Sequence, residues 1–302
     1  MAPGTPLGLV GIPSSVAAHA PGLERAPAAL RAAGLADALG VPLVDHGDTP
    51  VARWRHDPPR DESPHDAERV AEVLQEARAA VRGVLAHAHR PLVLGGECTV
   101  TLAVLAAFAD AGQDVGLVYV DGGQDLHLPA DHPDEPIADS MGVAHLLDLP
   151  GAHDALAGIG PRRPLLTPDR LAFVGFSDDE EDVHGQVPAL RLPASVVETD
   201  PSAAAAHAVA TVQGDDGFVV HLDVDVLDFL RLPLADIPTY GRGLAPDDLA
   251  TLLRGLVRSP GFGGLVLVEA NPDRDDAAGT HLRTLVRLLA HAFADEETPQ
   301  EG

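Results

Sequence analysis

Short apolar segments alternate with longer segments of helical period along almost the whole chain, and this alternation restricts the fold more than any other feature. It is typical of strand and helix units around a mostly parallel sheet. Each expected strand is interpreted as buried on both faces, which predicts that both faces of the sheet are covered. We therefore expect an α/β protein of the three-layer α/β/α sandwich type. The expected strands are Leu7–Ile12, Val41–Asp45, Pro91–Leu94, Val115–Val120, Leu171–Val174, Phe218–Val224 and Gly264–Val268. The expected helices are Ala26–Leu39, Asp66–Ala88, Thr99–Ala111, Ser202–Gln213, Ala245–Arg258 and Ala277–Ala294.

Length and composition fit one domain. A chain of 302 residues is within the range of one large α/β unit, and a hydrophobic content of 45% is enough for a sizeable core. The segment Arg55–Pro64 is expected to be a loop, because the alternation of strands and helices continues across it. We expect residues 1–294 to form the domain and residues 295–302 to be a disordered tail.

The charge of the chain argues against anionic partners. The formal net charge is −26, from 46 acidic and 20 basic residues. Such a surface repels phosphate backbones and anionic membranes, so neither nucleic acid nor a membrane is an expected partner. The acidic stretch Ser177–Asp182 is expected to be a solvated loop.

Cysteine use and the first residues bear on location. The only cysteine, Cys98, has no partner for an internal disulfide, and Met1 is followed by Ala-Pro-Gly-Thr-Pro instead of a secretory signal. No stretch approaches the apolar length that spans a membrane. We expect a cytoplasmic protein.

Polar residues are concentrated directly after four of the expected strands. Ligands of open parallel sheets bind beyond the carboxyl ends of the strands, so these positions are the first candidates for a site. The segments are Gly-Gly-Glu-Cys at 95–98, Asp-Gly-Gly-Gln-Asp at 121–125, His-Leu-Asp-Val-Asp at 221–225 followed by Asp228, and Glu-Ala-Asn-Pro at 269–272.

Four aspartates in these segments are expected to converge. Alternation along an extended strand places Asp223 and Asp225 on one face, and the glycine-rich turn can fold Asp121 and Asp125 toward one point. Like charges at such distances require a cation or raised pKa values. Oxygen-rich sites suit Mn²⁺ or Mg²⁺. A single Asp-x-Asp is equally a strand end or a turn cap; the whole ordered set is the specific signal.

The same segments resemble the signatures of the ureohydrolase superfamily of arginases, agmatinases and formiminoglutamases. Those signatures read Gly-Gly-Asp-His, Asp-Ala-His-x-Asp and Ser-x-Asp-x-Asp-x-x-Asp-Pro, and further matches run nearly from end to end. The resemblance implies an arginase-like sheet of about eight strands. It also implies a two-manganese cluster, whose bridging hydroxide attacks a guanidinium carbon, expels an amine and releases urea or an analogue. The further matches are 11–13, 22–27, 30–31, 45–48, 241–244 and 269–272.

The resemblance also implies residue roles. Asp121 and Asp223 would bridge the metals, Asp125 would complete the first site and orient the hydroxide, and Asp225 would serve the second. Cys98 falls on a histidine ligand, and its thiolate would also suit Zn²⁺ or Ni²⁺. We expect one or two metal ions. Glu269 falls on the glutamate that holds the substrate guanidinium, and we also expect substrate contacts from His127 and Glu180, in the loops 126–137 and 176–186.

Several positions depart from the family pattern. Gly123 replaces a histidine ligand of the second metal and offers no side chain. Asp139 replaces a histidine that shuttles protons near the substrate, although a helix cap is the interpretation we prefer for it. Phe229 replaces the final proline of the last signature. His127 or His132 is a candidate for the missing nitrogen ligand, and a helix amino terminus at Cys98 is expected to favour the thiolate.

Three hypotheses follow. The first is a metal-dependent amidinohydrolase-like enzyme that uses metal-activated hydroxide on a small guanidino, amidino or amide substrate, with a modified, possibly single-metal site. The second is a non-catalytic relative that binds a ligand or assembles with a partner. The third makes Cys98 a nucleophile, with His46, His127 or His221 nearby, although a buried small residue at a tight turn is the simpler reading. The resemblance implies a homo-oligomer, a trimer or hexamer.

Overall fold

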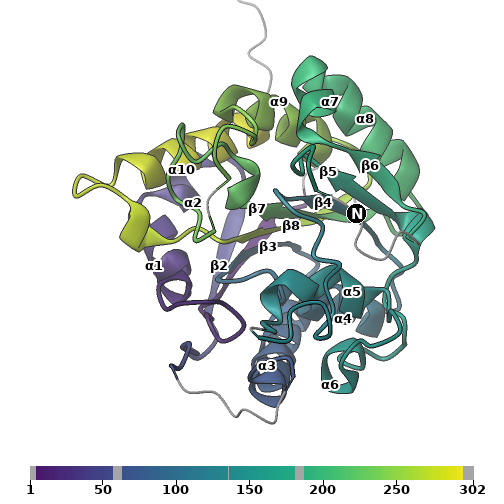
Figure 1. Cartoon of the computed structure of the whole chain (residues 1–302). Coiled ribbons are helices and arrows are strands. Elements are labelled where there is room, and N and C mark those ends of the chain that lie inside the picture. Colours follow the sequence, from purple (N-terminus) through teal and green to yellow (C-terminus); the bar gives the residue numbers. More distant parts are fainter. Residues whose placement is uncertain (1–4, 57–62, 135, 181–186, 238, 295–302) are drawn as a thin grey trace, which may run out of the picture.

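Eight parallel strands form one sheet in the order β2-β1-β3-β8-β7-β4-β5-β6, with helices packed on both faces (Figure 1). The structure is a computed structural model that describes residues 5–56, 63–134, 136–180, 187–237 and 239–294. It confirms the expected three-layer α/β/α sandwich. The strands are β1 Leu7–Ile12, β2 Leu43–Asp48, β3 Arg90–Gly95, β4 Gly116–Val120, β5 Leu171–Val174, β6 Leu190–Leu192, β7 Phe218–Asp223 and β8 Phe262–Val268.

Two strand predictions were wrong in detail. The strand β2 is mostly exposed, because it lies at the edge of the sheet and pairs only with β1. The strand β6 was not expected, because three residues at the opposite edge give too short an apolar signal.

The helices follow the expected alternation, with one break. The expected helix Ala26–Leu39 ends at Ala32 and resumes at Leu35, because Gly34 adopts a left-handed φ of 84°. Three short helices, α5, α6 and α7, were not expected. The α-helices are α1 Ala26–Ala32, α2 Leu35–Ala38, α3 Ala67–Ala86, α4 Val100–Asp110, α5 Gly142–Leu146, α6 Asp154–Ala157, α7 Ala194–Thr199, α8 Pro201–Val212, α9 Pro246–Val257 and α10 Thr280–Phe293.

The core is divided by the sheet into two clusters. One cluster joins Leu9 and Val120 of the strands to helices that include α1, α8, α9 and α10. The other joins Leu117 and Tyr119 to α3, α4, α5 and α6. Because side chains alternate along a strand, Tyr119 and Val120 of β4 point into opposite clusters. The face toward α4 is the one that continues into the polar strand exits.

The sheet order brings the four polar exits together. The strands that precede them, β3, β8, β7 and β4, are consecutive neighbours at the centre of the sheet. Their registers align the ends, with Val120 beside Leu222 and Asp223 beside Val268. Since all four strands are parallel, their carboxyl ends meet at one edge of the sheet.

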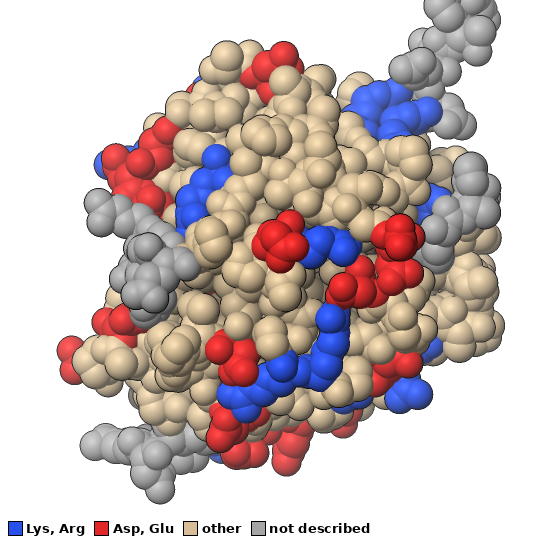
Figure 2. All heavy atoms as spheres, turned by 90° about the vertical axis from the view of Figure 1, so that its right-hand side faces the viewer, with Lys and Arg blue, Asp and Glu red and all other residues tan. Residues whose placement is uncertain are grey.

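The surface carries mixed charge on the face toward β6, α7 and α8, where arginine and acidic side chains are interspersed (Figure 2). Within the described ranges, no helix is long and apolar enough to cross a membrane. The predicted tail at 295–302 and most of the loop predicted at Arg55–Pro64, from 57 to 62, lie outside the described residues.

Candidate metal centre

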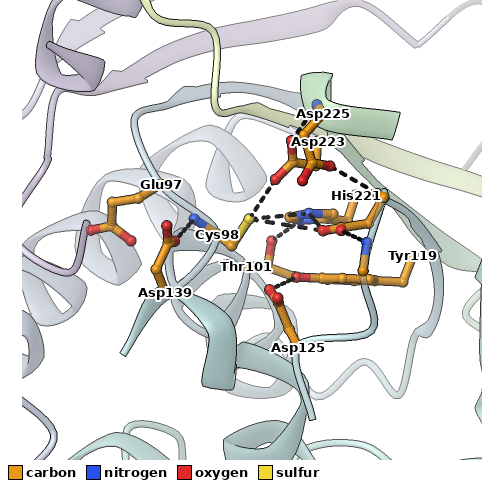
Figure 3. A network of polar contacts seen from close by, with 12 residues as sticks. Glu97, Cys98, Thr101, Tyr119, Asp125, Asp139, His221, Asp223 and Asp225 are labelled. Carbon is orange, nitrogen blue, oxygen red and sulfur yellow. Dashed lines mark hydrogen bonds and ion pairs between the residues drawn. The ribbon is translucent and has the colours of Figure 1, made fainter. Parts of the chain in front are cut away.

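Four buried side chains bring a sulfur, a nitrogen and two carboxylates to one point at the carboxyl edge (Figure 3). One ligand atom from each of Cys98, Asp121, His221 and Asp223 lies within 4.8 Å of every other. The Cys98 thiol donates to Asp223 Oδ2 at 2.9 Å and is 3.9 Å from Asp121 Oδ2. The expected convergence of the exits after β3, β4 and β7 is therefore present.

The turn after β3 is fixed by close packing of backbone. A Cβ at Gly96 would lie 1.6 Å from the carbonyl oxygen of Ser14, so this position excludes a side chain. The backbone N–H of Cys98 donates to Asp139 Oδ1 at 2.8 Å. The preferred interpretation of Asp139 as a helix cap was wrong, because it makes no cap for the short helix it begins at Asp139–Met141. Asp139 instead holds the turn at Cys98.

Backbone amides hold the carboxylates after β4 and β7. Asp121 Oδ1 accepts from Gly123 N at 2.6 Å, and Asp223 Oδ1 accepts from Asp225 N at 2.6 Å. The two turns are joined because Gly122 N donates to Asp225 Oδ1 at 2.8 Å. These bonds leave Oδ2 of Asp121 and of Asp223 facing the Cys98 sulfur.

Asp125 lies beside this group on the glycine-rich turn. It adopts a left-handed φ of 49°, and its backbone carbonyl accepts from Val143 and Ala144 at the start of α5. The hydroxyl of Tyr119 donates to Asp125 Oδ2. A strained backbone held by two elements is common at functional sites.

Glu269 and Asp139 form a second acidic group next to Cys98. Ligand atoms of these three residues lie within 4.8 Å of one another. Glu269 is 4% exposed, has a left-handed φ of 61°, and its Oε1 has no hydrogen-bond partner. Its backbone N–H donates to Gly96 O at 2.8 Å, which ties the exits of β8 and β3 together. Burial raises the pKa of Glu269 well above its usual value, and the neighbouring Asp139 raises it further. A buried carboxylate oxygen without a partner is costly in its ionised form.

No arginine among the described residues pairs with the acids of the cluster. Burial is the largest cause that raises the pKa of Asp121 and of Asp223 well above the usual range, and neighbouring aspartates raise both further. Burial also raises the pKa of Asp225, and raises that of Asp125 to about 7. Burial lowers the pKa of His221 to about 3, so its ring is neutral. Without a cation, the cluster strongly opposes joint ionisation.

The expectation of a ready thiolate at Cys98 was wrong for the protein without metal. Burial raises the pKa of the Cys98 thiol well above its usual value, and four aspartates, led by Asp223, raise it further. The helix that follows begins at Val100. Because of this raised pKa, Cys98 is a poor unaided nucleophile.

Some candidate residues lie elsewhere. Glu97, which belongs to the candidate segment 95–98, accepts hydrogen bonds from Ser14 and Thr99 and turns away from the sulfur of Cys98 (Figure 3). The rings of His127 and His132 pack on each other with centroids 4.4 Å apart and line a cavity with His19, Asp131, Pro133, Asp134, Ile137 and Ser140. The described contacts therefore do not bring either ring to the place of the missing nitrogen ligand.

Glu180 and Phe229 are two further positions that the sequence singled out. Glu180 is only half-buried, but its Oε1 would lie 3.9 Å from a Cβ at Gly123, and its pKa is raised by burial and by Asp225. Within the loop Ser177–Asp182 that was predicted to be solvated, Asp178 and Asp179 are exposed and Glu180 is half-buried. Phe229 packs edge to face on Tyr240, with ring centroids 5.3 Å apart.

Three residues of the centre were not identified from the sequence: Tyr119, His221 as a possible ligand, and Thr101. The rings of Tyr119 and His221 stack at 3.9 Å, because the two residues are partners in the register of β4 and β7. A signal was available, since Tyr119 and His221 each precede a candidate aspartate by two positions and so share its face. Thr101 had no such signal, because only the placement of α4 brings its hydroxyl to His221.

The fold and the cluster define a class: a three-layer α/β/α protein with a group of buried potential metal ligands at the carboxyl edge of a parallel sheet. The sequence model of the arginase family matches residues 5–294. The chain therefore belongs to the arginase family, within the ureohydrolase superfamily.

Individual relatives agree over nearly the full length. The chain is 25% identical to an arginase of Brevibacillus brevis over 305 residues, which covers 96% of this chain and 98% of the relative. Among solved structures, arginase from Bacillus caldovelox superposes with a TM-score of 0.83 at 22% identity, covering 97% of this chain and 99% of that one. A Trypanosoma cruzi formiminoglutamase variant with Mn²⁺ superposes with a TM-score of 0.74 at 18% identity, covering 96% and 92%.

The residues fit a metal ion in one part of the centre better than in the other. Cys98, Asp121 and Asp223 present sulfur and oxygen ligands around one point. A Cβ at Gly123 would lie 3.5 Å from Asp121 Oδ1, so a longer side chain here would point at the carboxylates, and glycine leaves that place without a ligand. The group around Cys98 therefore offers ligands for one metal ion, and beside Gly123 the described residues offer only carboxylate oxygens.

Proposed function

We propose that the chain is a metal-dependent hydrolase of the ureohydrolase type, which cleaves a C–N bond of a small guanidino or amidino compound. One observation carries the proposal: in a chain of the arginase family, Cys98, Asp121 and Asp223 surround one buried point, with no described arginine to balance the two acids. Two such acids coexist in ionised form only beside a cation, and a bound metal ion would supply one.

The metal would be held by Cys98, Asp121 and Asp223, with Asp125 and Asp225 at its margin. The family resemblance favours Mn²⁺, and the sulfur also suits Zn²⁺ or Ni²⁺. When bound, the ion supplies Lewis-acid activation of water near neutral pH. The protein holds the carboxylates in place beforehand through the amides of Gly123 and Asp225.

The substrate cation would be held by Glu269 together with Asp139. Support comes from the buried, unpartnered Oε1 of Glu269 and from the short distances within the group of Cys98, Asp139 and Glu269. A planar guanidinium has donors on several sides, which suits two carboxylates. Glu180, half-buried beyond Gly123, is proposed to contact the substrate from the other side. His127 remains a predicted substrate contact from its own loop.

Asp125 would move the proton of the reaction. The oxygen of water bonds to the guanidinium carbon, the bond from that carbon to the substrate amine breaks, and the proton released from water reaches the leaving nitrogen. Asp125 suits this transfer because the Tyr119 hydroxyl fixes its carboxylate beside the cluster. Glu269 and Asp139 keep the carbon oriented meanwhile.

The test combines metal content with turnover. Protein purified without chelator and supplied with Mn²⁺, Ni²⁺ or Zn²⁺ should retain metal by mass spectrometry and release an amine from arginine, agmatine or a guanidino acid. Asp125→Asn should lower kcat by about 100-fold or more. The control is Asp216→Asn, at the amino end of β7, where Asp216 Oδ2 accepts from Asp114 N at 2.7 Å, and its turnover should be unchanged.

Two outcomes would contradict the proposal. Protein that stays free of metal under every loading condition would remove its basis. Protein that retains metal but turns over none of the compounds would favour the alternative, a non-catalytic member of the family that binds a ligand. A homo-oligomer of three or six chains and a cytoplasmic location remain predictions, which sedimentation and cell fractionation test.

A further inference from the structure

His221 directs a ring nitrogen into the cluster from β7. Its Nε2 lies 3.4 Å from Asp121 Oδ2 and 3.7 Å from Cys98 Sγ, and the side chain is fully buried (Figure 3). It precedes Asp223 by two positions on the strand, so both side chains leave the same face of the sheet.

The ring of His221 is held on its other sides. Nδ1 lies 2.7 Å from Thr101 Oγ1 of α4, and Tyr119 stacks on the ring at 3.9 Å with an interplanar angle of 9°. Histidines that bind metal commonly engage their other nitrogen in a hydrogen bond, which fixes the ring and the tautomer. With Nδ1 engaged by Thr101, Nε2 is the nitrogen that faces the sulfur and the carboxylate.

We propose that His221 is the nitrogen ligand of this centre, and that Cys98, His221, Asp121 and Asp223 bind one tetrahedral Zn²⁺ or similar borderline transition metal in place of a two-manganese cluster. The inference rests on the proposed function for the location of the metal. It adds a ligand, the coordination number and the class of ion.

The distances between ligand atoms fit such a site. Zinc bonds of about 2.0–2.3 Å in tetrahedral geometry imply separations of about 3.3–3.8 Å between ligand atoms. The separations from His221 Nε2 to Asp121 and to Cys98 are 3.4 Å and 3.7 Å, and that from Cys98 to Asp121 is 3.9 Å. The 2.9 Å contact from Cys98 to Asp223 is shorter because the thiol donates a hydrogen bond there.

The ligand types select the ion. A sulfur, an imidazole and two carboxylates form a mixed set that suits Zn²⁺ or Co²⁺, whereas Mn²⁺ favours oxygen. Among the described residues, the atoms within 4 Å of a Cβ built at Gly123 are carboxylate oxygens, Asp121 Oδ1 at 3.5 Å and Glu180 Oε1 at 3.9 Å. The nitrogen and the sulfur therefore lie together on one side of Asp121, where one ion can use both.

The experiment uses the full chain, stripped with chelator and reloaded. Competition between Zn²⁺ and Mn²⁺ should leave about one zinc per chain. The Co²⁺ form should show a thiolate-to-cobalt absorption and the intense visible bands of four-coordinate cobalt. His221→Gln should weaken Zn²⁺ binding by at least ~100-fold, and Thr101→Val by ~10- to 100-fold through loss of the outer partner.

The controls separate ligation from folding. His145→Gln alters another buried histidine, which lies on α5 and whose Nδ1 is 2.7 Å from Met141 O. This variant should leave zinc affinity unchanged. Cys98→Ser should remove the thiolate absorption. If His221→Gln does not fold, zinc-edge X-ray absorption of the wild-type protein decides, because the proposal requires one sulfur and one imidazole at the metal.

The outcomes distinguish this inference from the proposed function. Binding of two Mn²⁺ ions with full turnover, or zinc without an imidazole ligand, would overturn the role of His221 and leave the hydrolase proposal intact. Failure to bind any metal would overturn both.

Discussion

Two carboxylates close in sequence, Asp110 and Asp121, have opposite surroundings and opposite pKa shifts. Asp110 ends α4 and accepts from Arg78 Nε and Arg78 Nη2, both at 2.6 Å. The Arg78 guanidinium is the main cause that lowers the pKa of Asp110. Asp121 follows β4 and is buried, and among the described residues its one potential cationic partner is His221 at 3.4 Å, which is neutral. Burial therefore raises the pKa of Asp121.

The difference separates an ion pair that stabilises the fold from a group of acids that we propose to bind a metal. The pair of Arg78 and Asp110 is complete within the chain and ties α3 to α4. The group around Asp121 is incomplete, because its charge has no described partner in the chain. Natural proteins keep such costly groups mainly where a ligand completes them. The predictions below change one member of each kind.

The largest effect is expected from Asp223→Asn, which removes a charge from the incomplete group. The variant should lose its metal, and with it about 4 kcal/mol of the stability that wild type has when free metal is ~1,000-fold above Kd. In chelator it should be at least as stable as wild type, because one of several crowded acids is gone. Metal analysis and urea unfolding with and without chelator measure both.

The matched variant is Asp110→Asn. It leaves Arg78 partly buried without its partner, so it should cost about 2 kcal/mol equally with and without chelator. Its metal content should not change. If Asp223→Asn lowered the free energy of unfolding as much in chelator as in excess metal, the two carboxylates would have the same structural role and the contrast would be wrong.

A smaller gain is expected from Gly123→His, which adds a nitrogen where the described neighbours, Asp121 and Glu180, offer carboxylate oxygens. A Cβ at Gly123 meets nothing closer than 3.5 Å, and this glycine does not adopt a positive φ, so the substitution fits. The metal content should rise from about one to about two ions per chain, worth up to ~3 kcal/mol of added stability in excess metal.

Gly123→Ala is the control for Gly123→His, since it adds the Cβ without a ligand and should bind no further metal. A histidine variant that still binds a single ion would show that the acids there cannot hold a second one.

The fold was predictable from the sequence because its signals are local. Apolar strands such as Leu7–Ile12 and Leu171–Val174 were placed to the residue, since burial on both faces leaves an unbroken apolar run. The edges were not predictable in this way. Burial at β2 and the existence of β6 depend on where a strand lies in the sheet, which the chain order does not reveal.

The acids of the site were predictable for the same reason, but its nitrogen was not. Asp121 and Asp223 lie at strand ends that any parallel sheet brings to one edge. The role of His221 depends on the adjacency of β4 and β7 and on the approach of Thr101 from α4. Asp139 was misread because its partner, Cys98, is remote in sequence. Contacts between distant segments decide these cases.

The smallest effect concerns His145, a buried titratable group that belongs neither to an ion pair nor to the proposed metal centre. Burial lowers its pKa from 6.5 to about 4, and its Nε2 has no partner among the described residues. Above pH 6.5 both the folded and the unfolded chain carry it neutral, so it costs nothing. As the pH falls toward 4, the unfolded chain binds a proton at His145 that the folded chain does not bind, and stability is lost.

Between pH 7 and pH 5.5 this loss of stability should be about 1 kcal/mol, and His145→Gln should remove it. Urea unfolding of wild type and variant at both pH values measures the difference, in which the titration of the acid cluster cancels because it is common to the two proteins. Equal pH dependence of the two would mean that His145 is protonated in the folded protein, and that burial alone does not keep a titratable group neutral at this depth.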